Sequence, residues 1–300
     1  MKLLLIWNPK AGKGRSEIIA RKFKVKLAQA GIDFEEVAEH ALDECLTHSE
    51  MKLQSGFFPA VVAIGGDGLV HNLLPILTRF HVALHIIPAG SGNDCARALN
   101  MYRISDAKRI QDIRAGLQEG KNRTVDLGEI DDGVSTQLFL QIASTGFDAH
   151  VNEHANSHPQ YPAGLKYLLS TLLLIWKVKP INYSFRVASD SERSSSVAAM
   201  LLLVANGPNY GGGMKIAPHA STTDGQLEVM YVLPVSPLEL LLVFPLVYFG
   251  LHVRHPKVRF LSTFSIELGG TGAIYADGEH CGNMPALIRI SEQKLTILAS

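Results

Sequence analysis

Short apolar runs and helical patterns alternate along the first 120 residues. The apolar runs are "KLLLIW", "AVVAI" and "ALHIIP", and helical patterns lie between and after them at about 16–30, 69–79 and 93–118. Continuous apolar runs separated by helices are typical of a parallel sheet that helices cover on both faces. The pattern therefore predicts a doubly wound α/β domain over residues 1–124.

From about residue 124 the pattern changes to short stretches with strand character. These stretches are "TVDLGEI", "TQLFLQIAS", "INYSFRVAS", "VAAMLLLVA", "QLEVMYVL", "FSIELGG", "ALIRIS" and "KLTILA", with turn residues such as "DDG", "SDSERSSS" and "TTDG" between them. Many short strands with regularly spaced turns favour an antiparallel sandwich or barrel. We predict a C-terminal antiparallel β-sandwich over residues 125–300, interrupted by helices near 164–177 and 237–251, and interpret "SDSERSSS" as a solvated hairpin loop.

Composition fits two ordinary domains and limits the classes of ligand. Of the 300 residues, 47% are hydrophobic and 19% are charged, which is enough to bury a core in each domain. Lys plus Arg and Asp plus Glu are balanced at 28 each, so no overall field favours nucleic acid, and any phosphate recognition is expected to be local. Three scattered cysteines argue against disulfides and for a reducing compartment, so we expect a cytoplasmic protein.

The apolar runs are too short for membrane spans. The start "MKLLLIWNPK" lacks the length of a signal-peptide core and is better interpreted as a first buried strand. The runs "LLSTLLLIW" and "LLLVFPLVYFGL" fall short of the roughly 20 residues that cross a bilayer, so no transmembrane helix is predicted. With Lys166, Lys177 and Lys179 nearby, these segments form either a basic-rimmed apolar surface for lipid or two core helices.

Glycine-rich polar turns follow the predicted parallel strands: "NPKAGKGR" (8–15), "GGDG" (65–68) and "PAGSGND" (88–94). Ligands of doubly wound sheets bind beyond the carboxyl ends of the strands, so these turns should meet at one edge. In the first turn, Lys10, Lys13 and Arg15 place cations at a strand-to-helix junction that attracts phosphate. The spacing of a Walker A loop is absent, which disfavours a P-loop NTPase.

The second and third turns carry side chains suited to phosphate chemistry. Asp67 stands among Gly65, Gly66 and Gly68, where the backbone allows a bulky ligand to approach. An isolated carboxylate beside phosphate is expected to hold a metal or to handle a proton. In the third turn the Ser91 hydroxyl could meet a phosphate oxygen, whereas Asn93 and Asp94 could cap the next helix or contact the ligand.

One further carboxylate lies beyond a glycine turn in the second half. In "IYADGEHCG" (274–282), Asp277-Gly278 forms a tight turn that would project Glu279. Such a carboxylate is a reasonable general base, although "DG" between strands is first of all a hairpin signal.

With "NPKAGKGR", "GGDG", "PAGSGND", "TGFDAHV", "GGGMKIAPHASTTDG" and "ADGE" in this order, the chain resembles the diacylglycerol kinase catalytic-domain family, in particular the bacterial soluble lipid kinases. The resemblance covers essentially the whole chain. "GGDG" is shared with NAD kinases and phosphofructokinases, which implies a first domain of their kind. The resemblance further implies an ATP-dependent kinase in which the nucleotide binds the α/β domain and the cleft to the β domain receives the lipid.

The resemblance also implies roles for single residues. Asp67 would act near the γ-phosphate together with Mg²⁺, and Glu279 would be the base for the acceptor hydroxyl. The implied nucleotide site consists of Asn8, Pro9, Lys10, Ala11, Gly12, Lys13, Gly14, Gly65, Gly66, Gly68, Leu69, Ser91, Asn93 and Asp94. A structural Mg²⁺ would be held at Asp224, flanked by Ser221 and Gln226, with Asp126 joining the network.

The chain departs from the family pattern next to Asp67. The family has a threonine after "GGDG" and then an "NE" pair, where this chain has Leu69 and His71-Asn72. A lost hydroxyl removes a hydrogen bond to a charged group worth about 1.5–3 kcal/mol. A neutral amide at Asn72 removes a charge that could pair with a cation. Ser91 stands in place of a threonine and retains the hydroxyl.

The leading hypothesis is therefore an ATP-dependent kinase of diacylglycerol or a similar lipid. Its expected partner is lipid at a membrane surface, contacted peripherally and transiently, and nucleic acid is not expected. One alternative is an NAD kinase, and another is a non-catalytic regulator that binds nucleotide or lipid. An exposed strand edge in the β domain is a candidate homodimer contact.

Overall fold

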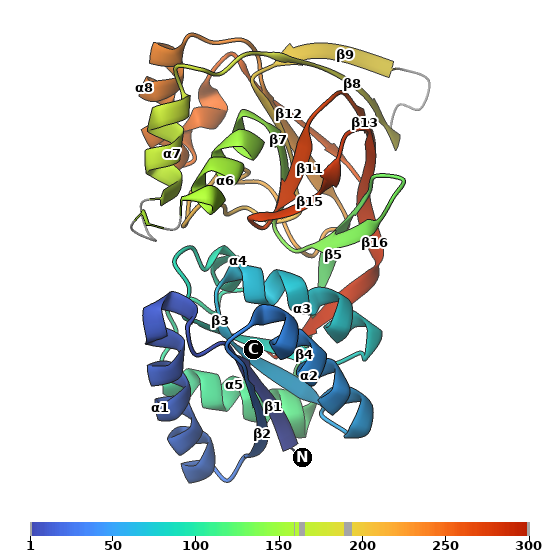
Figure 1. The fold of residues 1–300 in the computed structure, drawn as a ribbon. Helices are drawn as coiled ribbons and strands as arrows, with labels where there is room; N and C mark the ends of the chain where they lie inside the picture. The colour runs from blue at the N-terminus through green and yellow to red at the C-terminus, as the bar shows by residue number, and fades with distance from the viewer. Residues whose placement is uncertain (1, 159, 162–165, 189–193, 299–300) are drawn as a thin grey trace. The chain divides into compact units, whose positions relative to one another are not determined.

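The computed structural model describes residues 2–158, 160–161, 166–188 and 194–298, and the chain divides into two compact units. One unit comprises residues 1–125 together with 293–300, and the other comprises residues 126–292. Figure 1 shows the two units as ribbons, each with strands and helices.

The first unit contains a parallel sheet in the order β2-β1-β3-β4. Its elements are β1 (Lys2–Trp7), η1 (Ala11–Gly14), α1 (Arg15–Gln29), β2 (Asp33–Ala38), α2 (Leu42–Ser55), β3 (Ala60–Gly65), α3 (Asp67–Arg79), β4 (Ala83–Pro88), α4 (Asp94–Ala98) and α5 (Asp106–Glu119). β3, all of β1 after the exposed Lys2, and the first five residues of β4 are buried, as the apolar runs predict.

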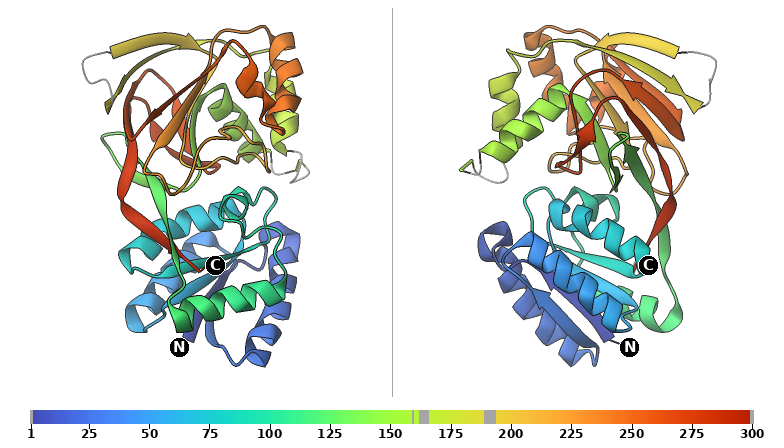
Figure 2. Two further views of the ribbon diagram at one scale, coloured as in Figure 1. Left: turned by 180° about the vertical axis from the view of Figure 1, so that it is seen from behind. Right: turned by 45° about the vertical axis from the view of Figure 1, so that its right-hand side comes forward.

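Helices cover both faces of this sheet (Figure 2). Alternate residues Leu3, Leu5 and Trp7 of β1 pack with Phe23 of α1 and Ile113 of α5 in one core cluster. α2 and α3 pack together and against β1 and β3. The doubly wound α/β prediction is confirmed.

Two elements of this unit were not evident from the apolar pattern. β2 lies at the sheet edge with only Val37 buried, so its sequence "DFEEVA" carries the polar residues of an exposed strand. α2 buries only Cys45, Ser49 and Leu53, a stripe too narrow and too polar to stand out.

The C-terminal segment returns to the first unit. β16 (Ala286–Ile297) is one continuous strand, where the sequence indicated two, "ALIRIS" and "KLTILA". Its end pairs in parallel with β4 through Ile297 and Leu84, and Leu298 N donates to Leu84 O at 2.9 Å. The predicted second domain over 125–300 thus differs from the observed unit, because residues from Gln293 onward belong to the first.

Two sheets of antiparallel strands form the second unit. One contains β13 (Ser265–Gly269), β8 (Ile181–Val187), β9 (Ser194–Ala199) and part of β16, and β5 (Arg123–Asp131) joins it with β6 (Thr136–Phe139). The other has the order β12 (Val258–Thr263), β11 (Leu227–Val232), β10 (Leu201–Ala205), β7 (Ile142–Gly146), β14 (Ala273–Ala276) and β15 (Glu279–Asn283).

The core of the second unit lies between these two sheets. Tyr183, Phe185 and Ile266 of the first sheet pack against Leu202 and Val229 of the other. This arrangement confirms the predicted β-sandwich.

Helices cover the outer face of the six-stranded sheet. They are α6 (Phe147–Ser157), α7 (Lys166–Leu174), α8 (Pro237–Val247) and the short η3 (Leu251–Arg254). Leu201 and Leu203 of β10 face these helices, whereas Leu202 and Val204 face the other sheet. β10 is buried on both sides, which explains its unbroken apolar sequence.

The helices differ in length from the prediction. α8 ends at Val247 because Gly250, with φ +70°, turns the chain into η3, and α6 was not predicted because its sequence is largely polar. Residues 164–165 of the predicted helix over 164–177, and residues 189–193 of the predicted hairpin loop, lie outside the described residues. Among the helices that the structure describes, none has the length and apolar character needed to cross a bilayer.

Candidate functional site

The three glycine-rich turns of the first unit touch one another. A Cβ placed on Gly12 would lie 2.3 Å from the carbonyl oxygen of Ala89, and one on Gly90 would lie 2.4 Å from the Cα of Gly66. Ala89 N also donates to Gly65 O at 2.8 Å. Glycine is required here because the loop backbones pack directly on each other, which no side chain would permit.

The first loop is folded onto itself by its own polar groups. Gly12, Lys13 and Gly14 are consecutive left-handed residues with φ of 60°, 59° and 84°. The side chain of Asn8 accepts from Lys10 N at 2.8 Å, and the buried Ser16 hydroxyl donates to Asn8 O. Asn8 therefore shapes the loop from within.

The exposed part of this loop is positive. Lys10, Lys13 and Arg15 are exposed, and α1 begins at Arg15, so its unpaired N–H groups and helix dipole lie beside these cations. Pro9 and Ala11 belong to the same turn, and both residues are half-buried. The loop has the charge and the free donors that an anionic ligand needs.

Asp67 links the second loop to the third. It is the first residue of α3, and its Oδ1 accepts a hydrogen bond of 2.9 Å from the backbone N–H of Cys95 in α4. The half-buried carboxylate thus holds the start of α4 in place and puts negative charge at the edge where the three loops meet.

The side chain of Asn93 closes the third loop and does not cap helix α4. The buried Asn93 accepts from Gly90 N at 2.9 Å and donates to Gly90 O at 2.8 Å, with a left-handed φ of 57°. Its side chain makes no capping bond to the start of α4, so of the two alternatives for Asn93, capping and ligand contact, the structure excludes capping. The buried Asp94 lies 3.8 Å from Arg97 Nε, and Ser91 is exposed.

The two departures beside Asp67 serve the packing of α3. Leu69 is buried, and a Cβ on Gly65 would lie 2.6 Å from its Cδ2, so its side chain covers the end of β3. Leu69 can therefore contact a ligand only through its backbone groups. Asn72 Nδ2 donates to Gly68 O at 2.8 Å and so stabilises the first turn of α3.

Glu279 stands on a hairpin that a neighbouring carboxylate anchors. Asp277 and Gly278 both have positive φ, 53° and 92°, and join β14 to β15. Asp277 accepts backbone N–H groups at 2.8, 2.8 and 3.3 Å from Leu140, Gln141 and Ile142. Asp277 was missed as a site-supporting residue because its partners lie more than 130 positions away.

The surroundings of Glu279 include a second acid and a phenol. Glu279 is half-buried at the start of β15. Burial, followed by the charges of Glu153 and Glu279, raises the pKa of Tyr275. Asn156 of α6 donates to Gly278 O at 2.9 Å and fixes the turn from the other side.

Asp126 supports the turn at Asp224, the turn for which the family resemblance implies a metal. Asp126 Oδ2 accepts from Gly225 N at 2.7 Å, and its own N–H donates to Thr222 O at 2.7 Å. Asp224, which is exposed, accepts from Gln226 N at 3.0 Å.

The turn that carries Asp224 offers oxygen donors. They include the Asp224 carboxylate and the hydroxyls of Ser221 and Thr223, which lie 3.2 Å from each other, and such donors suit Mg²⁺. Gln226 has an exposed side chain in the same turn. The described residues contain no cluster of three or more His, Cys, Asp or Glu side chains placed to hold a metal, so carbonyls and water would have to complete the coordination.

A mainly apolar cavity of about 70 Å³ lies in the second unit between the six-stranded sheet, α7 and α8. Its lining includes Phe147, Met230, Phe244 and Val258. Polar side chains also line it, among them Asp148, Glu239, His252 and His255. Such a mixture suits a mainly apolar ligand that carries a polar part.

Asp148 is the centre of a buried network that the sequence did not reveal. It accepts hydrogen bonds from Tyr167 and from Asn152, which also contacts the hydroxyl of Tyr210. Burial raises the pKa of the Asp148 carboxyl, and burial raises the pKa of Tyr167 well above its usual value. The stretch "TGFDAHV" indicated this region only through the family resemblance.

Comparison with known proteins identifies the family of this chain. The model of the diacylglycerol kinase catalytic domain matches residues 2–130, and that of the YegS C-terminal NAD kinase beta sandwich-like domain matches residues 141–299. A diacylglycerol kinase of Mycobacterium tuberculosis is 31% identical over 99% of this chain and 94% of its own length. The chain belongs to the diacylglycerol kinase family.

Other members and solved structures extend this result. A diacylglycerol kinase of Staphylococcus saprophyticus is 25% identical over 94% of this chain and 90% of its own. The crystal structure of a Bacillus anthracis diacylglycerol kinase has the same fold, with a TM-score of 0.72 at 18% identity over 100% of this chain and 97% of its own. The crystal structure of an Archaeoglobus fulgidus NAD kinase, solved with ATP, also shares the fold. It has a TM-score of 0.54 at 14% identity, and the match covers 99% of this chain and 93% of the NAD kinase chain.

Proposed function

We propose that this member of the diacylglycerol kinase family transfers the γ-phosphoryl group of ATP to a hydroxyl of diacylglycerol or a similar lipid. The observation that carries the proposal is the packing of three glycine-rich loops around Asp67 in a chain of this family. Phosphoryl transfer needs positioning and charge compensation more than covalent chemistry, and this loop cluster supplies both.

The first unit would bind the nucleotide. The left-handed turn over Gly12, Lys13 and Gly14 exposes backbone and cationic side chains where the phosphates would lie. The exposed Ser91 hydroxyl would donate to a phosphate oxygen. Leu69 would contribute only backbone, so the contact that a threonine would make is absent.

Mg²⁺ would supply neutralisation of phosphate charge when bound. Asp67 fits a place beside it because its carboxylate lies at the edge where the loops meet and is held there by Cys95 N–H. The turn at Asp224, with its oxygen donors, fits a structural Mg²⁺, and Asp126 would hold that turn in shape.

The second unit would supply the base and the lipid pocket. Glu279 would take the proton of the acceptor hydroxyl while the hydroxyl oxygen bonds to the γ-phosphorus. The bond from that phosphorus to the β–γ bridging oxygen breaks, and ADP leaves. The cavity lined by Phe147, Met230 and Phe244 would receive apolar parts of the acceptor. Its present volume of about 70 Å³ is smaller than a lipid chain, so binding would have to widen it.

The role of Glu279 can be tested by its amide variant. Glu279→Gln keeps the size of the side chain and removes the base, so kcat for transfer to dispersed diacylglycerol should fall about 10²–10⁴-fold with little change in the KM for ATP. Glu267→Gln, at an exposed position of β13, is the matched control and should retain wild-type kcat. Equal kcat values for both variants would refute the proposed base.

A further inference from the structure

Apart from Glu239 in its first turn, helix α8 is apolar on all sides although it lies at the surface. Leu240, Val243, Phe244 and Val247 line the cavity. Leu238 and Leu242 point away from it and are 58% and 67% exposed. A surface helix normally turns a polar face to water, and one that is apolar all round normally has a cover on its outer side.

The exposed apolar surface extends beyond α8. It includes Phe249, which is 73% exposed just after α8, and Leu173 and Trp176, which are 53% and 64% exposed at the end of α7 and just after it. α7 and α8 lie side by side over the same sheet in both Figures 1 and 2, and both line the cavity. We call Leu173, Trp176, Leu238, Leu242 and Phe249 the α7–α8 face.

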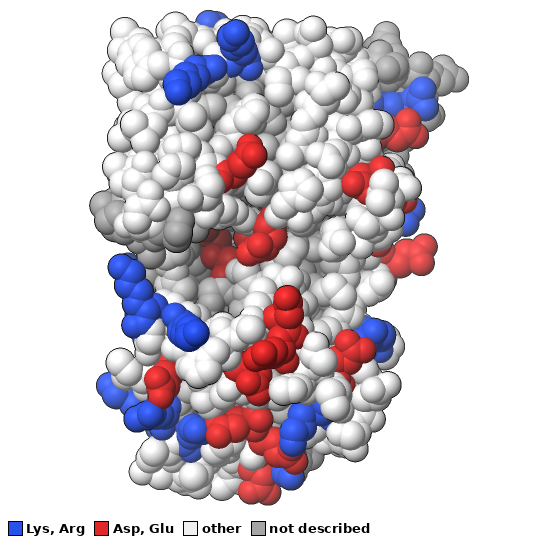
Figure 3. All heavy atoms as spheres, viewed as in Figure 1, with Lys and Arg blue, Asp and Glu red and all other residues white. Residues whose placement is uncertain are grey.

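Charge around this face is almost entirely positive. The segments 166–179 and 236–257 contain one acid, Glu239. Lys177, Lys179 and Arg254 are exposed in or next to them. The side of the second unit that carries α7 and α8 in Figure 1 is largely uncharged in Figure 3, with basic side chains along its upper edge.

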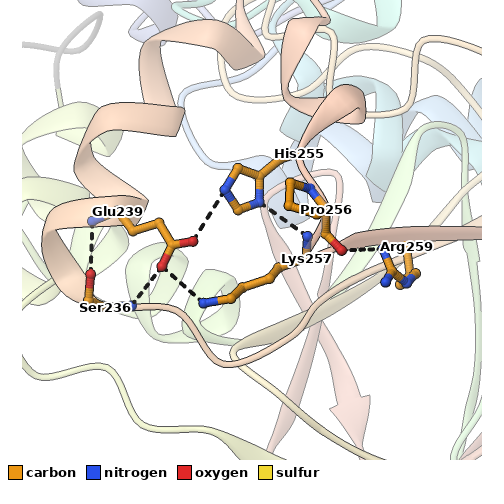
Figure 4. A network of polar contacts seen from close by, with 6 residues as sticks. All are labelled: Ser236, Glu239, His255, Pro256, Lys257 and Arg259. Atoms are coloured by element: carbon orange, nitrogen blue, oxygen red, sulfur yellow. Dashed lines mark hydrogen bonds and ion pairs between the residues drawn. The ribbon is translucent and has the colours of Figure 1, made fainter.

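The single acid is compensated by its neighbours. Figure 4 shows Glu239 between Lys257 Nζ at 3.1 Å and His255 Nε2 at 3.3 Å. His255 Nδ1 accepts from Lys257 N, so its Nε2 carries the proton that faces Glu239. Glu239 therefore adds no uncompensated negative charge, and it fixes the start of α8 through Ser236.

We infer that the α7–α8 face docks on an anionic lipid bilayer, and that α8 forms the wall between the bilayer and the cavity. An apolar patch rimmed by cations is complementary to acyl chains below anionic headgroups. This inference rests on the proposed function only for the nature of the ligand in the cavity. Docking itself requires neither ATP nor transfer.

Vesicle co-sedimentation of the full chain without ATP tests the docking. Phosphatidylcholine vesicles with phosphatidylglycerol should bind the chain, and vesicles of phosphatidylcholine alone should bind it at least tenfold more weakly. Leu242→Glu and Phe249→Glu, at exposed positions, should each reduce binding at least tenfold while retaining the wild-type melting temperature. Phe57→Glu, at a residue 85% exposed in the first unit, is the matched control and should bind like wild type.

The basic rim gives a second, independent measurement. Lys177→Glu and Lys179→Glu should each weaken binding to the anionic vesicles about fivefold or more and reduce its dependence on salt. Equal binding by wild type, Leu242→Glu and Phe249→Glu would overturn the inference. So would sedimentation that shows a dimer lost in Leu242→Glu without vesicle binding, because the face would then be a contact between copies of this chain.

Short-chain diacylglycerol dispersed in water separates this inference from the proposed function. Leu242→Glu should phosphorylate it at the wild-type rate, since Leu242 does not line the cavity. Transfer to this lipid without vesicle docking would refute the docking alone. Vesicle docking without transfer to any lipid would refute the proposed function alone.

Discussion

Asp67 has two roles that mutation can separate. It places a negative charge among the loops, and it accepts a hydrogen bond that holds the start of α4. Asp67→Asn keeps an oxygen that can accept from Cys95 N–H, and Asp67→Ala does not. We expect both variants to lose phosphoryl transfer by at least about 10²-fold, because the charge is gone in each. Only Asp67→Ala should also lower the melting temperature. Measured kcat and thermal unfolding check this, and full activity of Asp67→Asn would contradict a role for the charge.

Contact between the first and third loops can be tested at glycine. Gly12 and Gly14 both have positive φ, but only Gly12 lies against Ala89, and a Cβ on Gly14 meets nothing within 4 Å. Gly12→Ala should weaken ATP binding at least tenfold, because the added Cβ displaces the loops. Gly14→Ala should only introduce backbone strain, which lowers the free energy of unfolding by about 1 kcal/mol. Equilibrium titration with ATP checks this, and equal affinities would exclude the loop contact as a cause.

Candidate site residues could be picked out from the sequence where their signals are local. Asp67 and Glu279 stand beside glycines that must be glycine, so both could be found by inspection. Asn93 and Asp277 act through contacts that a linear pattern does not contain. Asp277 reaches residues 140–142, and Asn93 closes a loop whose shape follows from packing against Gly66.

Helix α8 depends on a capping box at its start. The Ser236 hydroxyl accepts from Glu239 N at 3.1 Å, and Glu239 accepts from Ser236 N. Ser236→Ala should lower the free energy of unfolding by about 1 kcal/mol and speed amide exchange in α8. Ser105→Ala, which removes the cap of α5, is the control. It should lower the free energy of unfolding by a similar amount without speeding amide exchange in α8. Unchanged exchange in Ser236→Ala would contradict the capping role.

Strongly apolar elements could be predicted, and weakly apolar ones could not. β1, β3 and β10 are buried on both faces and were evident from their sequences. β2 was missed because an edge strand presents polar residues to water, and α6 because its buried side includes polar residues such as Asp148 and Asn152. In each case tertiary contacts outweigh the local pattern.

Stability of the first unit should depend on pH through His85. His85 Nδ1 donates to Leu298 O at 2.9 Å, and burial lowers its pKa from 6.5 to about 4. The unfolded chain therefore takes up a proton between these values and the folded chain does not. The free energy of unfolding should be highest above pH 6.5 and fall by about 3 kcal/mol as the pH approaches 4.

Denaturation at several pH values checks this prediction. His85→Gln removes the titrating group, so it should flatten the pH dependence, although it lowers stability at neutral pH. His219→Gln, at an exposed position, should leave the dependence unchanged. If the free energy of unfolding of His85→Gln depended on pH as strongly as that of wild type, other groups would be the cause of the lower stability at acidic pH.

The two-part organisation followed from the change of pattern near residue 124, but the return of the C-terminus did not. "KLTILA" looks like any other short strand of the second half. Its place beside β4 follows from His85 and Leu84, which bind Leu298 through both a side chain and the backbone. Pairing of strands over 200 positions apart is not contained in a local apolar pattern.

The most direct test of the proposed function is the fate of labelled γ-phosphate. Purified chain with labelled ATP and Mg²⁺ should transfer label to a lipid when offered diacylglycerol, monoacylglycerol, a sphingoid base, phosphatidylglycerol and NAD together. The label should be lost from the product in Asp67→Asn and Glu279→Gln. Label in NADP, or nucleotide binding without transfer to any acceptor, would contradict a lipid kinase.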